Sequence, residues 1–291
     1  MTPKRWVSPH GHALAYTGSP GGPKPTLLLL HGVARCGEDW APLLPALQVH
    51  WNIVTLDHRG HGDSERAQTY FITDYAEDAT AFLREIASDP WVLLGHSLGA
   101  MVAAAVAARV PEYVRAVILE DPPFHTMGKR IQGTGWQALF KGMQTVALDG
   151  GTPTEITDKL AQIEIPGPDG KVSLLGALRT RDALQWSAEC LNRVDPAVFA
   201  PLVEGRWLEG FPVDEVLARI NCPTLLLQAD PHSGGACSDA DALAALNALN
   251  LGSHRRFEAA GHQLHREHPD AVLNAIADFR LQTNPTFAPH H

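Results

Sequence analysis

The sequence predicts an α/β fold with a mostly parallel central sheet flanked by helices. Short apolar runs alternate with helical patterns over most of the chain. The runs are nearly continuous rather than interleaved with polar residues, which is typical of parallel strands covered on both faces. Strands that alternate with helices are joined by right-handed crossovers, so they lie side by side in one sheet.

The predicted strands and helices follow from these patterns in chain order. The helix over 73–87 begins with Asp74 and Glu77 at capping-box spacing, and an alanine-rich helix over 98–110 ends before Pro111. The predicted strands cover residues 26–30, 52–56, 91–94, 116–119, 224–227 and, with a weaker pattern, 255–258. The other predicted helices of the sheet-containing part cover residues 213–220, 239–249 and 269–281.

The alternation of strands and helices stops between residues 123 and 210. This stretch carries helix-like patterns over 155–163 and 172–191, separated by turns rich in Gly and Pro, and no apolar run of the strand type. We therefore expect a core built from residues 1–122 and 211–291, with a helical insertion over residues 123–210.

Composition and charge exclude several classes of partner. The 291 residues carry 23 Lys and Arg against 32 Asp and Glu, a net charge of −9, and 45% of them are hydrophobic. Such a chain has enough apolar material for a large core but lacks the basic clusters that bind nucleic acid or an anionic membrane. The apolar stretch over 100–108 is too short to span a bilayer, and Pro9 interrupts any apolar N-terminal signal. We expect a cytoplasmic monomer or homodimer with no nucleic-acid or membrane partner.

Cysteine and histidine are the residue types that raise the question of a metal. The 4 cysteines are scattered without a C-x-x-C pair, and the 15 histidines lack ligand spacing supported by nearby carboxylates. We therefore expect no disulfide framework, no metal and no cofactor.

The strongest chemical signal is the G-x-S-x-G pattern over residues 95–99, with Ser97 at its centre. It follows the predicted strand over 91–94 and precedes the predicted helix over 98–110. A nucleophile on such a sharp strand-to-helix turn needs small flanking residues, and the helix N-terminus faces the negative charge that develops during acyl transfer. The context predicts that Ser97 is a nucleophile.

With this motif the chain resembles the α/β-hydrolase superfamily, specifically its serine carboxylesterase-like members. The resemblance covers about residues 24–280 and implies the α/β-hydrolase fold, with a helical cap inserted after the sixth strand. Further matching segments are Leu28–Gly32 before the oxyanion loop, Asp57–Ser64 after the next strand, Asn221–Leu227 before the acid, and Gly261-His262.

A serine hydroxyl needs a base, and the base needs a group that orients it. The family order is Ser, then Asp or Glu, then His, which makes His262 the expected base. His265 and His268 lie nearby, and we interpret them as surface or helix-capping histidines.

Two positions can supply the acid. Asp230 follows the predicted strand over 224–227, where most family members carry it, and it is the first candidate. Asp121 follows the strand over 116–119, where some relatives carry the acid, and it is the alternative.

The resemblance also implies an oxyanion hole made by the backbone N–H groups of Val33 and Leu98, since an intermediate with one charged oxygen needs two donors. The candidates for substrate binding are bulky or polar side chains near the nucleophile and in the insertion: His96, Phe124, Trp136 and Trp186. Lys129, Arg130 and Arg181 are basic residues that could meet an acidic substrate, although exposed basic side chains are usually only solvated.

The expected reaction is hydrolysis of a small-molecule carboxylic ester of small to medium size through an acyl-enzyme intermediate. A hydroxyl at position 97 excludes relatives that attack with a carboxylate at this turn. A carbon–carbon bond hydrolase, a lactonase, an amidase or a perhydrolase could use the same triad, because pocket shape separates these activities. A small-molecule receptor with a vestigial triad is the alternative from another class.

Overall fold

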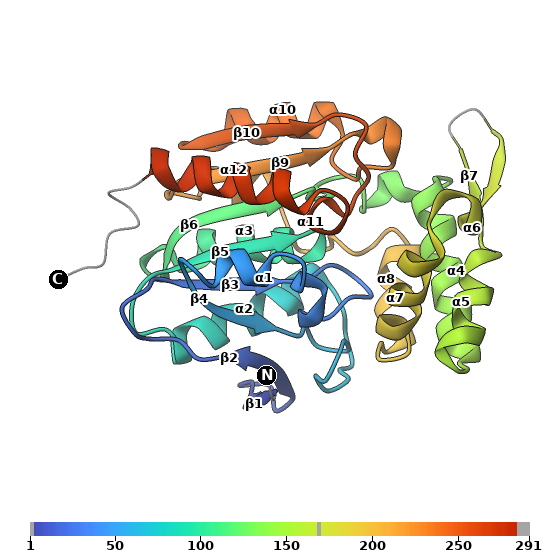
Figure 1. The fold of residues 1–291 in the computed structure, drawn as a ribbon, viewed down its shortest axis with the longest axis horizontal. Helices are drawn as coiled ribbons and strands as arrows, with labels where there is room; N and C mark the ends of the chain where they lie inside the picture. Colours follow the sequence, from blue (N-terminus) through green and yellow to red (C-terminus); the bar gives the residue numbers. More distant parts are fainter. Residues whose placement is uncertain (1–2, 168–169, 284–291) are drawn as a thin grey trace.

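The computed structural model describes residues 3–167 and 170–283, and its centre is an eight-stranded sheet (Figure 1). The strand order is β1-β2-β4-β3-β5-β6-β9-β10. The pairs β1–β2 and β2–β4 are antiparallel, and every other pair in the sheet is parallel. The strands are β1 (Lys4–Val7), β2 (Ala13–Gly18), β3 (Thr26–Leu30), β4 (Asn52–Leu56), β5 (Trp91–His96), β6 (Val114–Glu120), β9 (Thr224–Ala229) and β10 (Gly252–Phe257).

The prediction of a mostly parallel sheet is confirmed, and the predicted strands β3 and β4 have the expected bounds. The antiparallel strands β1 and β2 were not predicted, because exposed residues such as Lys4 and Arg5 break the apolar pattern. The helices outside the insertion are α1 (Leu44–Leu47), α2 (Ile72–Ile86), α3 (Leu98–Arg109), α9 (Val213–Ala218), α10 (Asp239–Ala248), α11 (Leu264–Glu267) and α12 (Pro269–Gln282). Single 3-10 turns are η1 (Gly37–Trp40), η2 (Pro111–Tyr113), η3 (Lys129–Ile131), η4 (Pro196–Phe199) and η5 (Pro231–Ser233).

The central strands are buried on both faces, which explains their continuous apolar runs. In β3, Leu28 and Leu30 pack in a cluster with α2 and α3, whereas Leu27 and Leu29 pack in a second cluster with α12. Successive side chains of a strand point to opposite faces, so a strand between two helical layers needs an apolar residue at every position.

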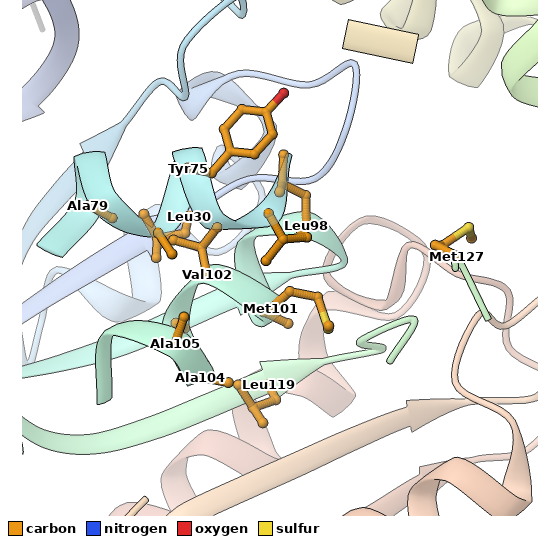
Figure 2. Packing of buried hydrophobic residues seen from close by; sticks show 14 of the residues in the cluster. Leu30, Tyr75, Ala79, Leu98, Met101, Val102, Ala104, Ala105, Leu119 and Met127 are labelled. Carbon is orange, nitrogen blue, oxygen red and sulfur yellow. The ribbon is translucent and has the colours of Figure 1, made fainter. Parts of the chain in front are cut away.

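Helix α3 begins directly after Ser97, and it is buried almost along its whole length (Figure 2). Its alanines allow close approach to the sheet, while Leu98, Met101 and Val102 fill the space toward Leu30 and Tyr75. A helix that is apolar all round belongs in the interior, and here its first turn is held firmly beside the end of β5.

The insertion lies beside the sheet, where its helices gather at the right of Figure 1. Its elements are α4 (Gly135–Asp149), α5 (Pro153–Ala161), β7 (Glu164–Pro166), β8 (Val172–Leu174), α6 (Leu175–Leu178), α7 (Arg181–Leu191) and α8 (Ala200–Val203). The insertion is mostly helical, as expected, but it also contains β7 and β8, a short antiparallel pair that the sequence did not predict. The single helix predicted over 172–191 is instead a strand, a short helix and α7, because Thr180 starts a new helix by accepting a bond from the N–H of Ala183.

Side chains tie the insertion to the core. Trp186 Nε1 of α7 donates to Asp39 Oδ1 at 2.7 Å, and the hydroxyl of Tyr70 donates to Asp195 at 2.7 Å. Cys36 Sγ lies 3.9 Å from Cys190 Sγ, and both thiols are free. In the described ranges, every helix is too short or too polar to cross a membrane.

Candidate active site

Ser97 stands on a strained turn between β5 and α3. Its backbone φ is 53° and its ψ is −111°, a region that residues with a side chain seldom adopt. The neighbouring glycines make this turn possible: a Cβ at Gly95 would lie 2.1 Å from the carbonyl oxygen of Gly99, and one at Gly99 would lie 1.9 Å from that of Leu30. The G-x-S-x-G sequence therefore reflects backbone packing on both sides of Ser97.

The imidazole of His262 pairs with Asp121. His262 Nδ1 lies 2.6 Å from Asp121 Oδ2, and both side chains are almost completely buried. A carboxylate at Nδ1 favours the tautomer that carries its proton there, which leaves Nε2 as the basic nitrogen. Ser97 and His262 line the same cavity.

The carboxylate of Asp121 is held by the backbone around it. It accepts bonds from the N–H groups of Ala229 at 3.1 Å, Ala236 at 2.7 Å and Cys237 at 3.2 Å. Such bonds satisfy the acceptor atoms of a buried carboxylate, and they also fix its direction toward His262.

The prediction that Asp230 pairs with His262 is wrong. Asp230 instead caps the turn η5, accepting from the N–H of His232 at 3.0 Å and from the hydroxyl of Ser233 at 3.0 Å. Its other bonds come from the N–H of Ala259 and from Arg256. Because Pro231 turns the chain immediately after β9, this carboxylate serves the turn, and the alternative acid, Asp121, contacts the histidine.

The backbone around Val33 is oriented by the buried ring of His31. His58 N–H donates to His31 Nε2 at 3.0 Å, so the proton of this ring sits on Nδ1 and is donated to the carbonyl of Gly32 at 2.8 Å. Burial lowers the pKa of His31 to about 4, which keeps the ring neutral. The C=O and N–H of a trans peptide point in opposite directions, so the N–H of Val33 points away from His31.

Neither the N–H of Val33 nor that of Leu98 has a backbone acceptor within the described ranges. Gly32 lies against the nucleophile turn, since a Cβ there would lie 3.3 Å from Ser97 Cβ. Val33 lines the cavity, and Leu98 begins α3, whose N-terminus favours negative charge.

The cavity that holds Ser97 and His262 has a volume of about 70 Å³ and is formed by both the core and the insertion. Two of the proposed substrate-binding residues, His96 and Trp136, line it. Trp136 also meets His262 edge to face, with 4.9 Å between ring centres. Its lining residues are Val33, Arg35, His96, Ser97, Trp136, Leu139, Phe140, Met143, Leu160, Leu175, Arg179, Ala183, Leu184, Ser187, His262 and Gln263. A larger surface depression of about 690 Å³ beside α2 contains neither Ser97 nor His262.

Phe124 and Trp186, the other two proposed substrate-binding residues, do not line this cavity. Phe124 is 1% exposed and packs in the core, where its φ is 34°. Trp186 faces Asp39, and the guanidinium of Arg266 lies 4.8 Å from its ring centre. The apolar bulk of Phe124 therefore fills interior space, and the partly buried Trp186 connects the insertion to the core.

His265 is completely buried, so its interpretation as a surface or helix-capping residue is wrong. Its Nδ1 lies 2.7 Å from Glu120 and its Nε2 lies 3.0 Å from Asp39. Burial alone would lower the pKa of His265, but these carboxylates outweigh burial and raise it to about 9. His265, Asp39 and His96 lie close enough to share a metal ion, yet both nitrogens of His265 are already bonded to carboxylates. His268 is exposed and precedes α12, as expected.

The comparisons with known proteins identify the family and the fold of this chain. The model of the alpha/beta hydrolase fold family matches residues 25–269. The chain belongs to this family. The predicted α/β-hydrolase fold is thereby confirmed. One similar protein is the 2-(acetamidomethylene)succinate hydrolase of Mesorhizobium japonicum, which is 36% identical to this chain over 101 residues. That match covers 34% of this chain and 36% of the relative, so the two proteins are matched over only about a third of their lengths.

Solved structures of the family share the whole fold. The enol-lactonase of Burkholderia xenovorans has a TM-score of 0.73 at 18% identity, with 96% of this chain and 100% of that chain covered. The N-formylmaleamic acid deformylase of Pseudomonas putida has a TM-score of 0.74 at 20% identity, with 94% of this chain and 100% of that chain covered. At such identities the likeness concerns the fold alone.

Proposed function

We propose that this α/β-hydrolase cleaves a carboxylic ester of small to medium size with Ser97 as nucleophile, His262 as base and Asp121 as the acid that orients the base. The observation that carries the proposal is the 2.6 Å contact between His262 Nδ1 and the buried Asp121. His262 itself lines the cavity that Ser97 also lines. A serine with no such base is a weak nucleophile at neutral pH.

The reaction proceeds in two halves. The Oγ of Ser97 attacks the ester carbonyl while His262 Nε2 takes its proton, and Asp121 stabilises the imidazolium that forms. The tetrahedral intermediate places its negative oxygen between the N–H groups of Val33 and Leu98. The C–O bond then breaks, the alcohol leaves with the proton from His262, and an acyl group remains on Ser97.

Water completes the cycle. His262 removes a proton from water, the hydroxide attacks the acyl carbonyl, and Ser97 recovers its proton as the carboxylic acid leaves. The insertion acts as a cap in this scheme, because ten of the residues that line the cavity belong to it and keep the acyl-enzyme from bulk solvent. A cavity of about 70 Å³ favours a short acyl chain.

Purified protein should be assayed with p-nitrophenyl esters of acetate, butyrate and hexanoate, and then labelled with a fluorophosphonate probe. We expect turnover and a covalent adduct on Ser97, both of which are lost in Ser97→Ala. Ser88→Ala is a matched control, since Ser88 is exposed and bonds only Asp89. Turnover that persists in Ser97→Ala would contradict the proposal.

Cleavage of an amide or a lactone is the second candidate, because the names of relatives include a hydrolase of an acetamido compound and an enol-lactonase. The same Ser97 chemistry serves a nitrogen leaving group if His262 protonates it. A panel that pairs each ester with the matching amide and lactone decides between these bonds, with kcat/KM as the measure.

A further inference from the structure

Two guanidinium groups stand in the wall of the cavity that holds Ser97. Arg35 follows the loop that carries Val33, and Arg179 follows α6 in the insertion. Among the residues that the structure describes, those lining the cavity include no aspartate or glutamate. The basic residues considered from the sequence lie elsewhere: Arg130 pairs with Asp241, and Arg181 pairs with Asp158 at 3.0 Å on the surface.

Arg35 is a buried cation whose hydrogen-bond partners, among the residues that the structure describes, are neutral. Its side chain belongs to a residue that is 8% exposed, and its Nη1 donates to the hydroxyl of Ser187 at 3.1 Å. When the side-chain amide of Gln263 is assigned with its oxygen facing the guanidinium, which satisfies both groups, this oxygen accepts from Nε at 3.1 Å and also from Nη2. Ser187 in turn donates to the carbonyl of Ala183, so its oxygen remains an acceptor for Arg35.

No carboxylate of residues 3–167 and 170–283 forms an ion pair with Arg35. The positive charge of Arg35 helps to lower the pKa of Asp39. The carboxylate oxygens of Asp39, however, are hydrogen-bonded to His265, Trp186 and Arg266 rather than to Arg35. Burying a charge without a counterion is costly, and neutral hydrogen bonds offset only part of that cost. An anion bound next to Arg35 would therefore supply the counterion that this buried guanidinium lacks.

Arg179 adds a second positive charge, which one carboxylate balances. Its Nη1 lies 3.1 Å from Glu267 Oε1, and Glu267 Oε2 accepts from the N–H of Gly261 at 3.1 Å. Burial lowers the pKa of Arg179 against the opposing effect of Glu267, and the charge of Arg35 lowers it further. The two guanidinium groups therefore repel each other electrostatically. Because Glu267 balances only one of the two positive charges, the pair carries a net positive charge.

We propose that Arg35 and Arg179 bind a carboxylate group of the substrate, so that the substrates are short acyl compounds carrying a free carboxylate near the bond that is cleaved. This inference rests on the proposed function, in which Ser97 attacks the acyl carbonyl. Guanidinium groups bind carboxylates through paired N–H donors, which gives both affinity and orientation. Arg35 lies two residues after Val33, so the anion and the oxyanion are held by one loop, and the apolar residues Trp136, Leu139 and Phe140 are left for the rest of the substrate.

The test compares two esters of equal shape, monoethyl succinate and ethyl 4-methylpentanoate, in which an isopropyl group replaces the carboxylate. Hydrolysis is followed by titration of released acid at constant pH. We expect the wild-type protein to prefer the monoanion in kcat/KM by about 10–100-fold, the usual range for a hydrogen bond to a charged group. Arg35→Gln and Arg179→Gln should each reduce this ratio, and Arg35→Lys should restore part of it because the charge remains.

Arg181→Gln is the matched control, since this exposed arginine lies in the insertion but not in the cavity, and it should keep the wild-type ratio. A wild-type protein that hydrolyses both esters equally, or prefers the neutral one, overturns the proposal. The same holds if Arg35→Gln loses both esters in equal proportion, since that indicates a purely structural role.

Binding of succinate separates this inference from the proposed function. Titration calorimetry with Ser97→Ala requires no turnover, and we expect succinate to bind Ser97→Ala but not Ser97→Ala combined with Arg35→Gln. If succinate binds in this way while the wild-type protein cleaves no ester, the proposed function fails and the anion site stands. If esters are cleaved through Ser97 without anion preference or succinate binding, only the anion site fails.

Discussion

His262 Nδ1 lies 2.6 Å from Asp121 Oδ2, although the two residues are 141 positions apart in the chain. Asp121 comes directly after β6, and its own N–H is bonded to Leu227 of the neighbouring strand β9 at 2.7 Å. The carboxyl ends of β6 and β9 therefore meet at one edge of the sheet, beside the end of β5 that carries Ser97.

The first prediction concerns this carboxylate. Asp121→Asn should lower kcat by about 10³–10⁴-fold, because an amide neither stabilises the imidazolium nor holds the correct tautomer. Asp230→Asn is the control, since Asp230 serves the turn η5, and it should keep the wild-type kcat. Steady-state kinetics with a p-nitrophenyl ester measures both. Loss of turnover in Asp230→Asn, with turnover kept in Asp121→Asn, would show that Asp230 and not Asp121 orients His262.

The second prediction separates two tryptophans of the insertion. Trp136→Ala should lower kcat/KM, because Trp136 lines the cavity and packs against His262. Trp186→Phe should leave kcat/KM unchanged but lower the free energy of unfolding by about 1–3 kcal/mol, since it removes a bond to a buried carboxylate. Kinetics and urea unfolding of both variants check this assignment, which fails if Trp186→Phe alters kcat/KM more than Trp136→Ala.

The third prediction is a pH dependence of stability that comes from His265. Its pKa is raised from 6.5 to about 9 in the folded state, so protonated His265 stabilises the fold below pH 6.5. This stabilisation, on the order of 3 kcal/mol, is lost as the pH rises from 6.5 through 9, because the ring then loses the proton shared with one carboxylate. His265→Gln does not titrate, so its unfolding free energy should change less over this window.

Urea unfolding at intervals between pH 6 and pH 10 measures the effect. The difference between the wild-type protein and His265→Gln should be constant below pH 6.5 and shrink above it. Parallel curves across the whole range would mean that folding does not shift the pKa of His265.

The fourth prediction tests the backbone packing behind the nucleophile. A Cβ at Gly99 would lie 1.9 Å from the carbonyl oxygen of Leu30, which belongs to a central strand that cannot move aside. Gly99→Ala should therefore cost more than about 4 kcal/mol of stability or prevent folding. Gly21→Ala is the control, since a Cβ there has open space and only the positive φ of 93° is strained.

Gly21→Ala should cost about 1–2 kcal/mol, the usual penalty for a side chain in the left-handed region. Denaturant midpoints, together with the yield of folded protein, compare the two variants. Equal midpoints would show that β3 and α3 can separate enough to admit a methyl group.

The strands β3 and β4, the helix α3 and the turn at Ser97 could be predicted because each depends on a local pattern. A continuous apolar run, a stretch of alanine and two glycines around a serine impose their structure within a few residues. The pair β1 and β2 could not be predicted, since its stability comes from pairing with β4 and the strands carry little apolar signal of their own.

Local patterns in the sequence are enough to predict the family, the succession of most of the strands along the chain, and Ser97 and His262 as the candidate nucleophile and base. Only the tertiary structure decided that Asp121 rather than Asp230 faces His262, that Trp186 belongs to an internal contact, and that Arg35 enters the cavity. The physical reason is that β6 and β9 end side by side with an acidic residue after each, so the chain order favours neither. The choice depends on the turn at Pro231 and on backbone N–H groups from distant segments, contacts that no local pattern encodes.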